Sequence, residues 1–200
     1  MSPRSKKIAE QMRGRSREAI LNAALELFAK QGYSGTTTDA IARNARVSKG
    51  LIFSHFATKQ DILFSIVDEQ FGRIINNVHK ENDARPAKEK LISFVDATLD
   101  LIKNDPLLAR LSLQLNIDDG YRKLMKNKKT KEYLDLFLAQ LKGIFKELGS
   151  NKPELDSYIL MFLFDGIVAN YTVAPELFPI DDIKNHLVDL LTTRWGAASD

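Results

Sequence analysis

The chain has 200 residues, 44% of them hydrophobic and 28% charged, and it contains no cysteine. These proportions are those of an ordinary globular protein, and they exclude a disordered chain and a disulfide scaffold. No apolar run reaches the eighteen or so residues of a membrane-spanning helix. Residues 1–17 are too polar to be a signal peptide, so we expect a soluble protein of the cytoplasm.

The net charge of +3 is unevenly distributed along the chain. Residues 1–59 contain eleven Lys and Arg against four Asp and Glu, a balance of +7, so the other 141 residues carry −4. Positive charge is expected to concentrate where a protein neutralises phosphates. The basic stretch from Arg4 to Arg13 has two interpretations that remain open: a disordered tail that aids solubility, or an arm that touches DNA.

Residues 37–56, TTDAIARNARVSKGLIFSHF, predict a helix-turn-helix. Thr37 or Thr38 can cap a short helix, a tight turn follows at residues 44–47, and Ser48 can cap a second helix. Both helices are too short to be stable alone. An upstream helix is expected to cover them with an apolar stripe formed by Ile20, Ala24, Leu27 and Phe28. The second short helix has the size and polarity of an element that enters a DNA major groove.

The pattern TTxxIAxxAxVSKGxIxxHFxxKxxIL, together with the helix before it, occupies roughly residues 20–63 and resembles the DNA-binding signature of TetR-type (TetR/AcrR-like) bacterial transcriptional regulators. The resemblance implies an all-α fold of about nine helices. It also implies two domains: a three-helix DNA-binding domain with a basic arm at 1–58, and a larger helical bundle for ligand binding and dimerisation at 59–200.

The resemblance further implies three groups of DNA-contacting residues. Side chains at the start of the recognition helix are expected to reach base edges, those on the preceding helix to reach the edge of the groove, and a set of hydroxyl, imidazole and ammonium donors to contact phosphates. Phe53 stands where the family usually has tyrosine, so a hydroxyl contact to phosphate is absent there. In order, the groups are Lys49, Gly50 and Leu51; Asp39 and Arg43; and Thr37, Thr38, Ser48, Ser54, His55 and Lys59.

From Lys59 onward the apolar spacing predicts helices almost throughout. Thr58 and Asp61 resemble a capping box that opens the first of them, which we expect to end near Glu81. Prolines and polar residues delimit the others, at about 86–104, 106–117, 121–148, 153–173 and 180–195. The basic residues at 122–131 are read as a solvated helix face or loop, in preference to a second nucleic-acid patch.

The last two predicted helices are apolar enough to need a partner. Paired with their copies in a second chain, they would form a four-helix interface with closed two-fold symmetry. The alternative is that they complete the core of their own chain. The expected interface residues are Phe162, Gly166, Ile183, Leu187, Leu190, Leu191 and Trp195.

The helical bundle also has the residues for a small-molecule site. Such sites lie between helices and combine apolar lining with a few polar groups that fix orientation. Most of the phenylalanines are expected to be core, and a minority to touch a ligand. The candidates are Phe64, Phe71, Phe94, Thr98, Leu111, Gln114, Phe137, Phe162, Asp165 and Tyr171.

Catalytic motifs are missing from the sequence. The three histidines are far apart and accompany no metal-binding or nucleophile motif, so we expect no enzyme activity, no catalytic residues, no metal and no cofactor. The expected function is sequence-specific regulation of transcription, as a repressor that a small, largely apolar ligand releases from its operator. The alternatives are an activator, or a ligand-binding helical module without DNA-dependent regulation. The expected partners are double-stranded operator DNA, a second copy of the chain and an unidentified small molecule, with no membrane.

The helix that begins at Lys59 is expected to carry the signal between the two domains. Its first turns should pack on the DNA-binding domain and its later turns on the bundle. A ligand wedged between this helix and the helix of Phe94 and Thr98 would tilt it and change the separation of the two recognition helices in the dimer.

Overall fold

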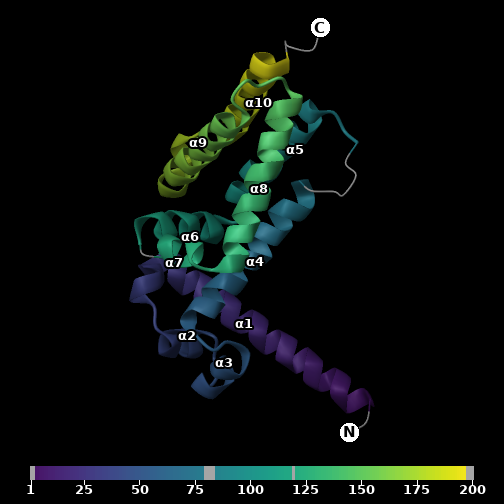
Figure 1. Ribbon diagram of the computed structural model, residues 1–200. Helices are drawn as coiled ribbons and strands as arrows, with labels where there is room; N and C mark the ends of the chain where they lie inside the picture. The colour runs from purple at the N-terminus through teal and green to yellow at the C-terminus, as the bar shows by residue number, and fades with distance from the viewer. Residues whose placement is uncertain (1–2, 79–83, 119, 197–200) are drawn as a thin grey trace.

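The computed structural model describes the backbone of residues 3–78, 84–118 and 120–196, and the side chains of residues 5–69, 84–118, 120, 122–191 and 193. In these ranges the chain forms ten α-helices, one short 3₁₀-helix and no strand, which confirms the all-α prediction (Figure 1). The elements are α1 (Pro3–Gly35), α2 (Thr38–Asn44), α3 (Lys49–His55), α4 (Lys59–Val78), α5 (Ala87–Asn104), α6 (Pro106–Ile117), α7 (Gly120–Met125), α8 (Lys128–Glu147), α9 (Pro153–Val173), η1 (Pro175–Leu177) and α10 (Ile180–Gly196).

There are more helices than the expected nine because the segment 121–148 is divided. The side chain of Asn127 accepts a hydrogen bond from the backbone N–H of Thr130 at 3.1 Å and so caps the start of α8. A capping side chain satisfies an N–H that the first turn of a helix leaves without a partner, and it favours a new helix start at that point. The short α7 therefore ends before α8 begins.

The helix-turn-helix has the predicted caps. Thr37 accepts a hydrogen bond from the N–H of Ala40 at 3.1 Å, and Ser48 accepts one from the N–H of Leu51 at 3.2 Å. Between α2 and α3 the backbone of Arg46 has a φ of 55°, in the left-handed region that a tight turn requires. These local devices fix where both short helices start, and packing supplies the rest of their stability.

Helix α1 is longer than the sequence indicated, and its end is irregular. Its N-terminal turns project away from the body of the molecule, past α3, as Figure 1 shows. At the other end Gly32 has φ 77° and ψ 163°, a conformation essentially limited to glycine. The chain turns there toward α2. The buried hydroxyl of Thr36 donates to the Gly32 carbonyl at 2.8 Å and holds this turn.

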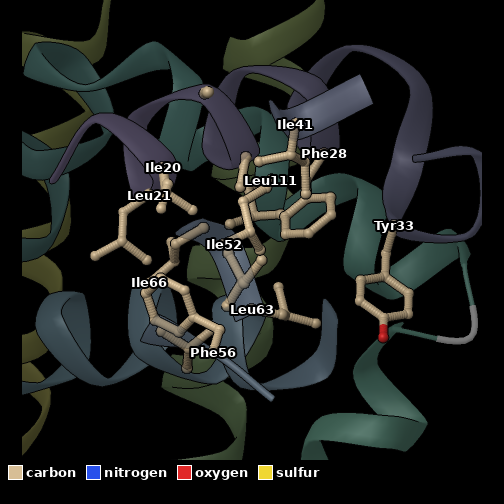
Figure 2. Close-up of a cluster of buried hydrophobic side chains, with 14 of the residues drawn as sticks. Ile20, Leu21, Phe28, Tyr33, Ile41, Ile52, Phe56, Leu63, Ile66 and Leu111 are labelled. Carbon is tan, nitrogen blue, oxygen red and sulfur yellow. The ribbon is translucent and has the colours of Figure 1, made fainter. Parts of the chain in front are cut away.

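One hydrophobic cluster, which we call the N-terminal cluster, holds α1, α2 and α3 together (Figure 2). Ile20, Phe28, Ile41 and Ile52 are fully buried at its centre. The cluster also contains Ile62, Leu63, Ile66 and Val67 of α4, Leu108, Leu111 and Leu115 of α6, and Leu124 of α7. The helix-turn-helix therefore shares one core with α4 and α6. The domain boundary at 58/59 stays a prediction, since apolar packing continues across it.

A second cluster, the C-terminal cluster, joins α5, α8, α9 and α10. The ring of Phe94 lies 5.4 Å from the rings of both Phe137 and Phe164, so three helices contribute to one aromatic group. Such contacts add to the free energy gained from removing the rings from water. Lys184 of α10 and the carboxylates of Asp96 and Asp100 on α5 form ion pairs at the edge of this cluster.

Helix α4 lies between the two clusters and begins as predicted. The N–H of Thr58 donates to Asp61 at 2.8 Å, and the N–H of Asp61 donates to the Thr58 hydroxyl at 3.1 Å, which completes a capping box. The expected end of the helix near Glu81 lies outside the described residues.

Candidate DNA-binding interface

Helix α3 presents the start of its outer surface to solvent. Lys49 and Gly50 are exposed, Leu51 is 37% exposed and Phe53 is 48% exposed, while Ile52 on the opposite side is fully buried. Exposed apolar side chains such as Leu51 and Phe53 are informative on a helix whose opposite side is buried in the core. A Cβ placed on Gly50 would meet nothing closer than Ser48 Oγ at 4.0 Å, so another surface can approach the backbone here.

Lys49 forms an ion pair with Asp39 in the free protein. Its Nζ lies 2.7 Å from the carboxylate of Asp39 on α2, and both side chains are more than half exposed. Exposed pairs of this kind contribute at most about 1 kcal/mol, so a phosphate or base edge can compete for the ammonium. The structure thus brings two of the predicted contact residues together, one cationic and one anionic. Arg43 lies exposed on the same short helix as Asp39.

The predicted hydroxyl groups all lie at the ends of the short helices. Thr37 and Ser48 accept hydrogen bonds from the backbone, which leaves each O–H proton available to a phosphate oxygen. Thr38 is half-buried in the first turn of α2. The hydroxyl of Ser54 donates to the carbonyl of Leu51 at 2.8 Å, so this proton already has an acceptor in the free protein.

Lys59 is oriented differently from the expected phosphate contact. Its Nζ donates to the carbonyls of Tyr33 at 2.6 Å and of Thr36 at 2.7 Å, and it lies 4.1 Å from the centre of the Tyr33 ring. Burial, followed by the charge of Lys123, lowers the pKa of Lys59. The ammonium donates to carbonyls where α1 ends, and there the Tyr33 carbonyl also accepts the backbone N–H of Thr36 at 3.3 Å. A phosphate contact by Lys59 stays a prediction, and it would compete with these bonds.

His55 joins the recognition helix to α1. Its Nε2 lies 2.8 Å from the hydroxyl of Ser16, and its ring packs near that of Phe56, with centres 6.1 Å apart. Burial is the largest cause that lowers the pKa of His55, and the positive charges of Arg13 and Arg17 lower it further. The neutral imidazole is therefore favoured in the free protein.

The ten candidate ligand residues do not gather in one place. Leu111 is buried in the N-terminal cluster, Phe64 packs against it, and Gln114 lies beside Gly32 at the end of α1. These three lie on α4 and α6, near the N-terminal cluster and away from the aromatic group of the C-terminal cluster, and their contact with a ligand stays a prediction. Phe71 lies in α4, but its side chain is outside the described residues.

The remaining ligand candidates divide between the bundle interior and its surface. Phe94, Phe137 and Thr98 belong to the interior, where the hydroxyl of Thr98 donates to the Phe94 carbonyl at 2.9 Å. Phe162 and Tyr171 line a surface hollow of about 310 Å³ between α9 and α10. Asp165 is exposed on α9, where desolvation by its surroundings raises its pKa.

The expected interface residues also divide into two groups. Phe162 is 66% exposed and Leu190 is 54% exposed, Ile183 is half-buried, and a Cβ on Gly166 would meet no atom within 4 Å. Leu187 and Leu191 are instead buried in the C-terminal cluster, because the stripe that contains them faces α5. For these two leucines the intramolecular alternative is the correct one. The side chain of Trp195 lies outside the described residues.

We use the term α9–α10 face for the exposed apolar surface formed by Leu155, Ile159, Phe162, Leu163 and Val173 of α9 and Leu190 of α10. Each of these side chains is at least 42% exposed. Several exposed apolar side chains on a helix pair are typical of a protein–protein contact.

Sequence reasoning missed the polar side chains that join helices far apart in the sequence. Asp118, at the end of α6, accepts hydrogen bonds from both the N–H and the hydroxyl of Ser34. Arg17 of α1 pairs with Glu69 of α4, and Lys129 of α8 pairs with Asp68 of α4. None of these contacts has a local signal, because the partners lie between 52 and 84 residues apart.

Within the part of the chain that the structure describes, no group of three or more His, Asp or Glu residues could hold a metal ion. Over the same part, no helix is both long and apolar enough to cross a membrane.

Comparison with known proteins agrees with this geometry. Residues 20–66 match the family model described as bacterial regulatory proteins, tetR family. The fatty acid metabolism regulator protein of Bacillus subtilis (strain 168) is 28% identical over 182 residues, which cover 87% of this chain and 92% of that protein. An HTH-type transcriptional repressor of Mycobacterium tuberculosis is 36% identical over 103 residues, or 52% of this chain and 47% of the repressor.

A solved structure extends the likeness to the whole fold. The transcriptional regulator FadR from Bacillus subtilis, in complex with stearoyl-CoA, is 26% identical with a TM-score of 0.70, over 87% of this chain and 96% of that chain. The matched helix-turn-helix, the capped α2 and α3 and the helical C-terminal bundle together identify the chain as a DNA-binding transcriptional regulator of the TetR family.

Proposed function

We propose that this regulator is a homodimeric repressor of the cytoplasm, without enzyme activity, that a fatty-acyl thioester releases from its operator. The observation that carries the proposal is the exposed start of α3, where Lys49, Gly50 and Leu51 stand on a helix whose inner side is fixed in the core. A helix with this arrangement can place side chains against base edges in a major groove.

The residues predicted to position the protein on DNA, at phosphates or at the groove edge, surround that helix. Arg43, Thr37 and Ser48 lie at or near the ends of α2 and α3, where their donors can fix the register of the protein on DNA without reading sequence. The net charge of +7 over residues 1–59 supports a DNA-binding role for the same surface, since counterion release supplies much of the affinity for DNA.

Two comparisons support the choice of effector. The relative from Bacillus subtilis is named for fatty acid metabolism, and the similar solved structure holds stearoyl-CoA. In the present chain an acyl chain would enter among α5, α8 and α9, where Phe94, Phe137 and Phe164 are in contact. Gln140 of α8 has a buried side-chain oxygen without a hydrogen-bond partner among the described residues, three positions beyond Phe137. Such an atom is costly unless a ligand or water satisfies it.

The α9–α10 face supports the dimer. In a two-fold assembly the same apolar surface of both chains is removed from water, which makes the contact self-complementary. Substitution of Phe162 by Arg is expected to convert the dimer to a monomer in sedimentation. Ile117, which is 74% exposed at the end of α6, supplies the matched control, and Ile117→Arg is expected to remain dimeric.

The function is tested by selecting a preferred duplex from random sequences with the purified protein, then titrating the complex with stearoyl-CoA. Stearoyl-CoA is expected to release the DNA, while coenzyme A alone is expected to leave it bound. Failure to select any sequence contradicts a sequence-specific regulator. Selection of a sequence that stearoyl-CoA does not release contradicts only the effector class.

A further inference from the structure

The N-terminal part of α1 extends beyond the core that holds the rest of this helix. Contact with the N-terminal cluster begins at Ile20, whereas residues 6–15 are all exposed and project past α3 (Figure 1). We call residues 5–15 the arm. A short helix that covers no apolar surface gains little from packing and is marginally stable alone. The arm therefore lacks a binding surface within its own chain.

The arm is strongly basic. Lys6, Lys7, Arg13 and Arg15 stand against a single acid, Glu10, and none of the four forms a salt bridge with a described carboxylate. Arg17, just beyond the arm, is different because Glu69 of α4 holds it at 2.6 Å. The charge of the arm is thus available to an external anion, while the neighbouring charge is used to fasten α1 to α4.

Helical spacing places two of these cations on the face of α1 that is directed toward the recognition helix. Lys6 and Arg13 are two turns apart, so they lie on the same face of α1 as Arg17 and Ile20. That face contacts the end of α3: the guanidinium of Arg17 lies 5.6 Å from the centre of the Phe56 ring, and the adjacent Ser16 reaches His55 at 2.8 Å. Lys7 and Arg15 point away from this face.

We propose that the arm docks along the DNA backbone beside the operator half-site, with Lys6 and Arg13 on phosphates. The proposal rests on the function given above and adds a second DNA-contacting element to it. From Lys6 to Arg13 the helix rises by roughly 10 Å, so the two cations can reach different phosphates of the DNA backbone. The contact is to phosphate, so it adds affinity and flanking protection without base preference.

Salt-dependent binding to a mixed-sequence duplex, long enough for two half-sites, tests the arm without knowledge of the operator. The double variant K6Q/R13Q removes the two cations on the α3 side, and K7Q/R15Q removes the same charge from the other side. Both pairs lie outside the packed core, so the fold is retained, and circular dichroism checks this.

For K6Q/R13Q the slope of log affinity against log salt is expected to become shallower by about two, as loss of two phosphate contacts requires. For K7Q/R15Q the change is expected to be less than one. Hydroxyl-radical footprints of the wild type are expected to extend further into the flanking DNA than those of K6Q/R13Q.

Three results would overturn the arm contact. Equal slopes for the wild type and K6Q/R13Q mean that the arm does not touch DNA. Equal losses in both variants mean general charge attraction without a docked face. A dimer that dissociates when the exposed Ile8 and Met12 are changed to Ser means that the arm packs on a second copy instead. A wild type that binds no duplex removes the proposed function as well, so the two failures are distinct.

Discussion

The carboxylate of Asp118 holds Ser34 by two hydrogen bonds, from the backbone N–H at 2.7 Å and from the hydroxyl at 2.6 Å. Asp118 follows the last residue of α6, and Ser34 belongs to the irregular end of α1. Gly32 lies so close that a Cβ there would be 3.3 Å from the same carboxylate. The start of the helix-turn-helix is therefore fastened directly to the end of α6.

Substitution of Asp118 by Asn is expected to destabilise the protein by about 1 kcal/mol, because two bonds to a charged carboxylate are replaced by weaker bonds to a neutral amide, whose NH2 can only donate to the Ser34 hydroxyl. Ser34→Ala, which keeps the backbone bond, is expected to cost less. Gly32→Ala is expected to cost about 1–3 kcal/mol from backbone strain. Urea unfolding of the three variants measures these differences. Equal stability of D118N and the wild type would show that the two bonds contribute nothing.

Lys59→Met is expected to lower stability more than DNA affinity. The variant removes the two hydrogen bonds that the ammonium donates to the Tyr33 and Thr36 carbonyls, at about 1 kcal/mol for a half-buried pair of bonds. Since the ammonium points to α1, the salt slope should change by less than one unit. Arg43→Ala is the contrast: this exposed side chain is expected to change the slope by about one and stability by less than about 0.5 kcal/mol. If Lys59→Met changes the slope of log affinity against log salt by a full unit, Lys59 does contact a phosphate.

The Lys49–Asp39 pair predicts effects of opposite sign for its two members. Lys49→Ala is expected to relax preference at one operator position by about 1–3 kcal/mol if the side chain reads a base. Asp39→Asn removes a negative charge from the DNA-facing surface and frees Lys49, so it is expected to strengthen binding to all sequences. Titrations against operator variants at several salt concentrations separate the two effects. An unchanged base preference in K49A would remove Lys49 from the residues that specify sequence.

His55 predicts a loss of stability in mild acid. Burial and the charges of Arg13 and Arg17 hold the pKa of His55 in the folded protein below the ordinary value of 6.5. Between that lower pKa and pH 6.5 the unfolded chain therefore binds more protons than the folded one. Stability therefore rises with pH across that interval and falls as pH drops below 6.5. His55→Gln keeps a hydrogen-bonding group for Ser16 without the titration. Urea unfolding at about pH 7.5 and about pH 5 is expected to show a smaller pH effect in the variant. An equal pH effect in both proteins would show that groups other than His55 cause the loss of stability in acid.

Local chemistry made the helix-turn-helix predictable. A cap such as Thr37, Ser48 or the Thr58–Asp61 box acts within three residues, so the sequence alone specifies it. The packing direction of Leu187 depends on where α5 lies, and the orientation of Lys59 depends on where α1 ends. Both follow from contacts between distant segments, which a hydrophobic stripe does not encode. The stripe in α10 correctly indicated an apolar surface, but not which helix would cover it.

The last prediction concerns how ligand binding and DNA binding are coupled through α4. Two consecutive residues of this helix bind opposite parts of the molecule: Asp68 pairs with Lys129 of α8 at 2.6 Å, and Glu69 pairs with Arg17 of α1 at 2.6 Å. A ligand that enters among α5, α8 and α9 and shifts α8 relative to α4 must disturb the first pair. Because Asp68 and Glu69 are consecutive in one helix, we expect the disturbance to reach α1 and the recognition helix.

Asp68→Asn is expected to leave operator binding intact while it reduces the factor by which ligand weakens that binding, a factor typically of about 5–150. Linkage requires DNA to weaken ligand binding by the same factor, so titrations of ligand with and without operator measure the coupling independently. Glu132→Gln is the matched control, since Glu132 pairs with Lys128 within α8 and forms no salt bridge with another helix among the described side chains. If D68N keeps the full wild-type factor in both titrations, the signal does not pass through this pair. A ligand with equal affinity for free and DNA-bound protein would exclude coupling altogether, because it could favour neither state.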